Sequence, residues 1–146
     1  MIAKIFKMVW YVSVFIYMVV LMYVYAGLPE EVEVMQAGNM YMLLGREAFF
    51  YMFLALAALS NFLVFSYYNI RKKQDEDALL SWTLGLGIVL NGFYIFSLNF
   101  ISLYNSAEKI NYKFSGYMLY AGLYLLVIWV FAWPIYSLFR KFLSKA

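Results

Sequence analysis

The sequence contains no cysteine and no histidine. Without cysteine, the chain cannot form disulfides, use a thiol nucleophile, or hold a zinc ion or iron–sulfur cluster through thiolates. Without histidine, it lacks the usual axial ligand of haem and the side chain that most often titrates near neutral pH. We therefore expect no cofactor and no metal site, and we do not expect a haem-bearing cytochrome subunit.

Charged residues are also scarce, at 13% of the chain, whereas hydrophobic residues make up 66%. Soluble domains carry about 25% charged residues. The 146 residues of the chain have the length of one domain. A soluble domain of this size buries only about two thirds of the surface of its unfolded chain, which is too little to hide so many hydrophobic residues. This composition therefore favours a lipid bilayer as the solvent, with membrane lipids as partners.

Four uncharged apolar runs fill residues 8–29, 48–70, 78–107 and 114–139. Each exceeds the roughly 20 residues that a helix needs to cross the hydrocarbon core. The first run could also be a signal peptide, with Lys4 and Lys7 as its basic region, but its length and aromatic content favour a retained helix. We predict an all-α membrane protein, a single domain over 1–146. Its four transmembrane helices, at about 8–28, 47–70, 79–104 and 114–139, should form an up-down bundle.

The distribution of lysine and arginine predicts the orientation of this bundle. Eight of the 11 lie on one side if the four runs cross the membrane in turn, and three lie on the other. We therefore expect both termini to be cytoplasmic and the loops at 28–47 and 105–113 to face outward. The net charge of +3 is explained by these helix ends, so we expect no nucleic-acid partner.

The outer loop at 28–47 is the most distinctive segment outside the runs. Pro29 ends the first helix, Glu31 to Val34 alternate as in a short strand, and Ala37-Gly38-Asn39 is typical of a turn. The apolar residues that follow should lie on the end of the bundle or against a partner. The candidate partner-contact residues are Met40, Tyr41, Met42, Leu43, Leu44, Arg46 and Glu47.

Arg46 and Glu47 allow two interpretations. Glu47 suits the positive end of a helix dipole, and Arg46 can extend its charge to the interface. The alternative is a contact with a partner or with a lipid headgroup.

Small and polar residues inside the runs indicate helix packing. Gly85, Gly92 and Asn99 recur every seven residues, and glycine lets a neighbouring backbone approach closely. Asn61 and Asn91 can form interhelical hydrogen bonds. We predict helix-packing roles for all five, with a polar substrate route as the alternative. Pro134 is expected to kink the last helix and to free a carbonyl near Val130.

The exit of the first helix, Leu28-Pro29-Glu30-Glu31-Val32-Glu33-Val34 followed by Ala37-Gly38, resembles a bacterial membrane domain of unknown function found in Sdp-type immunity proteins. The resemblance covers about 20 residues. The histidine that this family usually carries after the extended stretch is replaced by Met35-Gln36. The resemblance implies a small helical protein of the bacterial inner membrane and assigns no functional residue.

No Asp, Glu, Lys or Arg lies deep inside any run, although such residues usually mark ion pathways and proton relays. The sequence shows no nucleophile–base pair and no phosphate-binding loop. We therefore expect no enzyme and no catalytic residue. The leading prediction is a non-catalytic accessory or scaffold subunit that binds other membrane protein subunits. Alternatives are a small stand-alone transport, sensing or immunity-like protein, and an enzyme acting on lipid or quinone.

Overall fold

The computed structural model contains four long helices and one β-hairpin, and it describes residues 2–37, 40–73, 77–106 and 112–143. The elements in chain order are α1 (Ile2–Gly27), β1 (Glu31–Ala37), β2 (Met40–Gly45), α2 (Arg46–Arg71), α3 (Asp77–Tyr104) and α4 (Tyr112–Leu143). All four helices are long and apolar enough to span a membrane, so the prediction of four helices of membrane-spanning length is confirmed.

Two helices are longer than the hydropathy of the runs predicts. Helix α1 begins at Ile2 rather than near residue 8, and α4 ends at Leu143 rather than near residue 139. Both extensions contain lysine or arginine. The long stems of these side chains let the charge reach water while the backbone stays helical, so charge marks the edge of the apolar run and not the end of the helix.

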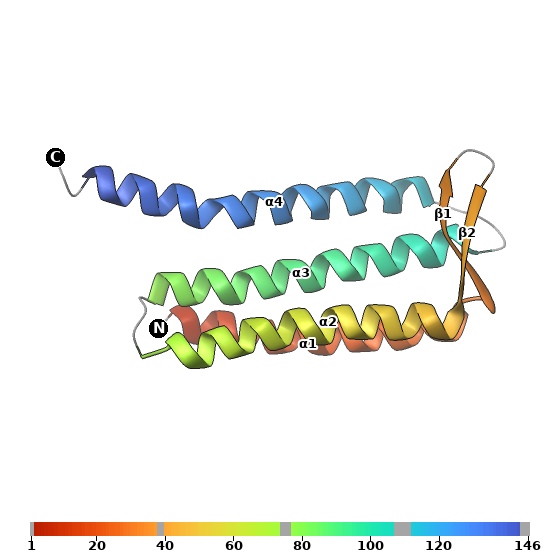
Figure 1. Cartoon of the computed structure of the whole chain (residues 1–146), viewed down its shortest axis with the longest axis horizontal. Coiled ribbons are helices and arrows are strands. Elements are labelled where there is room, and N and C mark those ends of the chain that lie inside the picture. Colours follow the sequence, from red (N-terminus) through yellow and green to blue (C-terminus); the bar gives the residue numbers. More distant parts are fainter. Residues whose placement is uncertain (1, 38–39, 74–76, 107–111, 144–146) are drawn as a thin grey trace.

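Successive helices run in opposite directions, so the two ends of the chain lie at one end of the molecule and the hairpin at the other (Figure 1). Helix α3 is central and packs against α1, α2 and α4. Among the described residues, the backbone of α4 approaches that of α3 and of no other helix. The structure therefore differs from a symmetric bundle: α1, α2 and α3 pack together, and α4 lies along the far side of α3.

Local sequence explains the contact between α4 and α3. Gly122 is buried against Phe96, and a Cβ atom at this glycine would lie 2.8 Å from Cδ2 of that ring. A Cβ atom at Gly116 would similarly lie 3.4 Å from Cε2 of Phe100 in α3. The rest of α4 is mainly exposed apolar surface, including Tyr117, Tyr120 and Tyr124. Helix α4 therefore uses one narrow face for packing.

The buried core belongs to α1, α2, α3 and the hairpin. Its larger cluster lies toward the hairpin, and a smaller one lies toward the chain ends. Val32 of β1 belongs to the larger cluster, so the hairpin is packed onto the helices and does not stand free in solvent. The fully buried large side chains are Tyr17, Leu21, Val24, Val32, Phe49, Leu84, Asn91 and Leu98.

The predicted outer loop is an antiparallel hairpin in which Val32 pairs with Leu44. The alternation from Glu31 to Val34 lies in β1, and a bulge falls between Glu33 and Met35. The apolar segment at 40–44 forms β2. Of the predicted turn, residues 38–39 lie outside the described residues. Backbone pairing satisfies the polar groups of this segment and explains how it can be both apolar and outside the helices.

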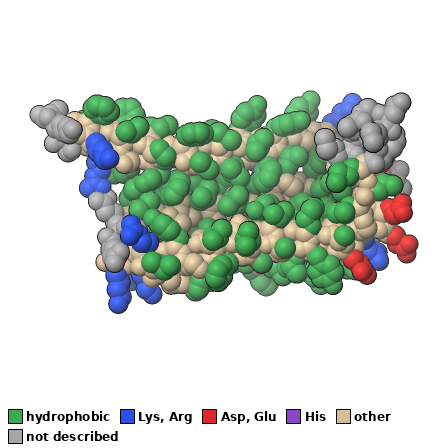
Figure 2. All heavy atoms as spheres, in the orientation of Figure 1, with side chains coloured by type: hydrophobic (Ala, Val, Ile, Leu, Met, Phe, Trp, Pro, Cys, Tyr) green, Lys and Arg blue, Asp and Glu red, His purple; other side chains and the backbone are tan. Residues whose placement is uncertain are grey.

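Charge separates along the long axis of the molecule. Figure 2 shows lysine and arginine side chains mainly at the end where the chain begins and ends, and acidic side chains at the hairpin end. The described basic residues at the first end are Lys4, Lys7, Arg71, Lys72, Lys73, Arg140 and Lys141. At this end, the Asp77 carboxylate accepts hydrogen bonds from the backbone N–H groups of Ile2 and Ala3 at 3.1 and 3.3 Å, so the start of α3 caps the start of α1.

Candidate functional site

A polar cluster lies at the centre of the helix core and joins α1, α2 and α3. The Asn61 and Asn91 side-chain amides donate to each other, with distances of 2.8 Å and 3.1 Å. Asn91 also donates to the Ser13 hydroxyl at 2.9 Å, and the Trp10 indole nitrogen donates to Asn61 Oδ1 at 2.8 Å. Asn91 is 0% exposed and Trp10 is 4% exposed, whereas Ser13 and Asn61 are half-buried, so most of the cluster lies within the helix core.

The hydrogen-bonding groups of this cluster are largely used up by the protein itself. The second N–H of the Asn61 amide donates to the Ala57 carbonyl at 2.9 Å, and the Ser13 hydroxyl donates to the Trp10 carbonyl at 2.7 Å. An asparagine amide offers two donors and one acceptor oxygen, and Asn61 uses all of them. The arrangement is that of interhelical packing and leaves little capacity for a passing polar substrate.

Gly87 makes this close approach of the helices possible. A Cβ atom at Gly87 would lie 2.8 Å from Trp10 Nε1 and 3.2 Å from Val64 Cγ1. The absence of a side chain on α3 thus makes room for the indole of α1 that bonds Asn61.

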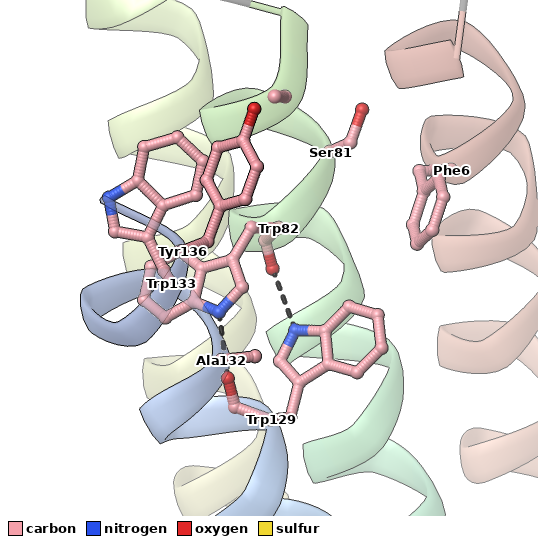
Figure 3. A pocket seen from close by; sticks show the side chains of 8 residues that line it. Phe6, Ser81, Trp82, Trp129, Ala132, Trp133 and Tyr136 are labelled. Atoms are coloured by element: carbon pink, nitrogen blue, oxygen red, sulfur yellow. Dashed lines mark hydrogen bonds between the residues drawn. The ribbon is translucent and has the colours of Figure 1, made fainter. Parts of the chain in front are cut away.

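A second contact, between two tryptophans, joins α3 to α4. The indole N–H of Trp82 donates to the Trp129 carbonyl at 2.8 Å, and the indole N–H of Trp129 donates to the Trp82 carbonyl at 3.0 Å. Figure 3 shows the two rings crossing between the helices, with Trp133 and Tyr136 beside them. The Trp129 carbonyl lies one residue before Val130, the position whose carbonyl Pro134 was predicted to free.

Two apolar cavities flank Trp129 in the strip between α1 and α4, which we call the α1–α4 groove. One, of about 280 Å³, is lined by Phe6, Ala78, Ser81, Trp82, Trp129, Ala132, Trp133 and Tyr136 (Figure 3). The other, of about 340 Å³, is lined by Ile5, Phe6, Val9, Gly85, Ile88, Val89 and Trp129. The Phe6 and Trp129 rings meet across the groove with centroids 6.3 Å apart.

At the opposite end, Asn105 holds the hairpin to α3. Its Oδ1 accepts from the Glu33 N–H at 2.7 Å, and its Nδ2 donates to the Glu33 carbonyl at 3.0 Å. Nδ2 also donates to the Ile101 carbonyl at 2.8 Å. The amide thus pairs with both backbone groups of one β1 residue, as a neighbouring strand would.

Arg46 joins the hairpin to the helices on the other side. Its backbone N–H donates to the Glu30 carbonyl at 2.9 Å, and its guanidinium lies over the Tyr25 ring at 5.3 Å from the centroid. Glu30, Gly45, Arg46 and Glu47 line a cavity of about 310 Å³. This cavity differs from the groove because charged side chains form its walls.

The structure separates the five predicted helix-packing residues into two groups. Asn61 and Asn91 meet in the polar cluster, and Gly85 packs so tightly against the Trp129 ring that a Cβ there would overlap it. By contrast, a Cβ at Gly92 would have no atom within 4 Å, and Asn99 is exposed. The regular stripe Gly85, Gly92, Asn99 is therefore covered at one end and open at the other.

The predicted partner-contact residues are also distributed over different surroundings. Met42 and Leu43 are exposed, whereas Leu44 packs against the core. The side chains of Met40 and Tyr41 lie outside the described residues. Arg46 and Glu47 line the charged cavity.

Sequence reasoning missed several residues that hold these contacts. Trp10, near the start of the first apolar run, is buried and donates to Asn61. No periodic pattern in the sequence distinguishes three others, Ser13, Gly87 and Asn105, because each makes its contact with a residue of another element. The only available signal was composition: a polar or small residue within an apolar run must be accommodated by a neighbour.

The chain has four helices that are long and apolar enough to span a membrane, and polar side chains join three of them inside the core. These features are those of a multi-pass membrane protein. Among the described residues, no group of three or more Asp or Glu side chains is placed to hold a metal ion. Comparisons with known protein families, curated proteins and solved structures gave no match. The resemblance of the hairpin segment to the Sdp-type immunity domain therefore stays a prediction.

Proposed function

We propose that the protein is a non-catalytic accessory subunit of a larger assembly in a bacterial inner membrane. The observation that carries this proposal is the α1–α4 groove, in which the small and polar face of α3 is left uncovered at Gly92 and Asn99. A transmembrane helix of another subunit is the proposed occupant.

Helical spacing places the open residues on one face with Gly85. Seven residues make nearly two helical turns, so Gly92 and Asn99 follow Gly85 along the same side of α3. Gly85 lines the cavity of about 340 Å³ between α1 and α4. The groove therefore continues from a cavity walled by Trp129 to a stretch where α3 faces the surroundings.

The chemistry of this face suits a helix better than lipid tails. Glycine at 92 permits close backbone approach, and the Asn99 amide can bond to a partner helix, as small and polar residues do in membrane helix pairs. An acyl chain offers no hydrogen-bonding group for an amide. The exposed Asn99 side chain thus favours a polar or backbone partner from protein.

The alternative of a stand-alone transport or sensing protein has less support. Its polar route was expected to use Asn61, Asn91 and Asn99, yet the first two bond to each other. Asn99 lies on the exposed part of α3, away from them. A route through these residues would require breaking the polar cluster.

The proposed orientation has both termini in the cytoplasm. It is supported by the basic residues that gather at the end of the molecule holding both ends of the chain (Figure 2), since lysine and arginine are enriched on the cytoplasmic side of membrane proteins. The chain has no native cysteine. Single cysteines introduced at Lys73 and at Leu43 can therefore be labelled with a membrane-impermeant maleimide in intact cells. Only the Leu43→Cys variant should react.

The partner is tested by replacing Asn99 with a photoreactive amino acid and irradiating native membranes. We expect a discrete protein adduct of higher mass. The matched control is the same replacement at Phe15, an exposed residue of α1 that lies outside the groove lining. Lipid adducts alone at position 99, together with a monomer that co-purifies with no other protein, would contradict the proposal.

A further inference from the structure

The charged cavity at the start of α2 suits a ligand with two opposite charges. Arg46, which carries a guanidinium, and Glu30 and Glu47, which carry carboxylates, line the same cavity of about 310 Å³. This volume is at the lower end of small-molecule sites. The cavity lies where the apolar span of α2 begins, at the level where lipid headgroups meet a membrane helix.

The Arg46 side chain has unused hydrogen-bonding capacity. Its Nη1 donates to the Leu28 carbonyl over a long 3.4 Å, and its guanidinium faces the Tyr25 ring. Its Nε is buried and has no partner among the described residues. A guanidinium carries five N–H donors in a fork that matches a phosphate. A buried donor without an acceptor is costly, but Nε has no accessible surface for an outside ligand to contact. The terminal amino groups of the guanidinium are the donors for a ligand, since Nη1 makes only the long bond to the Leu28 carbonyl, and this geometry points to an acceptor supplied there from outside the chain.

The backbone beside Arg46 adds to the positive side of the cavity. Gly45 is the N-cap of α2 and has no side chain to bond the N–H groups of the first turn that follow Arg46, whose own N–H donates to the Glu30 carbonyl. These groups and the helix dipole favour an anion at this position. The two carboxylates in the same wall would repel a purely anionic ligand, and they would attract an ammonium group attached to the anion.

We infer that this cavity binds the headgroup of a zwitterionic phospholipid that carries a phosphate and a primary ammonium, the chemistry of phosphatidylethanolamine. The phosphate lies against Arg46 and the start of α2. The ammonium lies against Glu30 and Glu47, and the acyl chains follow the apolar surface of the helices. The inference is independent of the groove and of the proposed subunit partner.

The experiment is native mass spectrometry of the full chain in detergent, titrated with phosphatidylethanolamine or with phosphatidylglycerol of the same acyl chains. We expect at least about fivefold tighter retention of the ethanolamine lipid. Soluble phosphoethanolamine, added as a competitor, should displace the lipid only at far higher concentration. If it displaces the lipid at equal concentration, the site recognises a free phosphate compound and the lipid inference is wrong.

Three variants test the roles of the residues. R46Q should weaken retention of both lipids by about tenfold, the cost of one charge-assisted hydrogen bond. The double variant E30Q/E47Q should remove the preference for the ethanolamine lipid while phosphatidylglycerol is retained at least as well as before. The control K113Q, an exposed cation at the start of α4, should change neither.

A fourth variant keeps the test valid if R46Q disturbs folding. Gly45 has φ −59° and ψ 140°, which any residue can adopt, and a Cβ there meets no atom within 4 Å. Gly45→Val should therefore fill the cavity without backbone strain and reduce retention of both lipids, with a thermal unfolding midpoint that falls only slightly because valine is a poorer N-cap than glycine. Equal retention of the two lipids by the wild type, or undiminished retention by Gly45→Val, would overturn the inference.

Discussion

Asn61 and Asn91 form a reciprocal amide pair between α2 and α3, with Asn61 Nδ2 2.8 Å from Asn91 Oδ1 and Asn91 Nδ2 3.1 Å from Asn61 Oδ1. Ser13 and Trp10 of α1 bond to the same pair. These four side chains thus fix how α1, α2 and α3 are rotated about their axes and how far each is shifted along the bundle axis. The pair differs from general apolar packing because it is satisfied in only one arrangement of the helices.

Replacing Asn91 with leucine should lower the free energy of unfolding in detergent by about 1–2 kcal/mol, because the Asn61 amide and the Ser13 hydroxyl each lose a partner. The matched control Asn99→Leu, on the exposed part of the same helix, should change it by less than about 0.5 kcal/mol. A double-mutant cycle with Asn61→Leu should give a coupling energy of about 0.6–1.7 kcal/mol. Additive effects of the two leucine variants would show that the pair is not coupled.

Gly87→Ala should destabilise the protein by about 1–3 kcal/mol, because the added methyl group would meet the Trp10 ring and Val64. Gly92→Ala is the control in the same helix, with open space at the added atom. It should be neutral or stabilising by up to about 1 kcal/mol, the difference in helix propensity between the two residues. Thermal unfolding of both variants in the same detergent checks the prediction, and equal midpoints would contradict it.

Trp129→Phe should loosen α4 from α3 because it removes the indole N–H that donates to the Trp82 carbonyl. The expected loss is about 0.5–1.5 kcal/mol, seen as faster hydrogen exchange along α4 with little change in α1. Trp133→Phe is the control, because Trp133 also lies near Trp82 but its indole makes no hydrogen bond with the other residues drawn in Figure 3. Faster exchange spread evenly over all four helices would be evidence against a local role.

Asn105→Ala should free the hairpin from α3, because the amide that pairs with both backbone groups of Glu33 is lost. The backbone amide of Glu33 should then exchange with solvent at least about tenfold faster, corresponding to roughly 1.4 kcal/mol of local protection. Ser106→Ala, whose hydroxyl donates to the Leu103 carbonyl at the end of α3, should leave that amide protected. Unchanged exchange in Asn105→Ala would mean that β2 and Val32 hold the hairpin without it.

Hydropathy and alternation predicted the number of long helices and the extended segment after Pro29. Both depend on properties of consecutive residues, such as the length of an apolar run or a period of two. The same reasoning could not predict that the backbone of α4 would approach α3 and no other helix, because apolar residues cover most of each helix and the sequence does not distinguish a side that faces lipid from a side that packs against a neighbour.

The seven-residue stripe shows where sequence reasoning stops. Gly85, Gly92 and Asn99 do share a face, but periodicity cannot show which face a neighbour covers. Asn91 lies about 100° around α3 from Gly92, and this rotation places it in the core, whereas Asn99 stays exposed. Asn91 is buried because it bonds to residues of two other helices, with Trp10, Ser13 and Asn61 in the same cluster. No local pattern in α3 contains that information.

The packing of the α4 backbone on α3 has a consequence for how the protein is made. Every side chain of the polar cluster, and every residue of the larger buried core, precedes residue 106 in the chain. During synthesis, the first three helices can therefore complete their packing before α4 enters the membrane. Helix α4 is added last onto a finished surface of α3, and its arrival closes one wall of the groove.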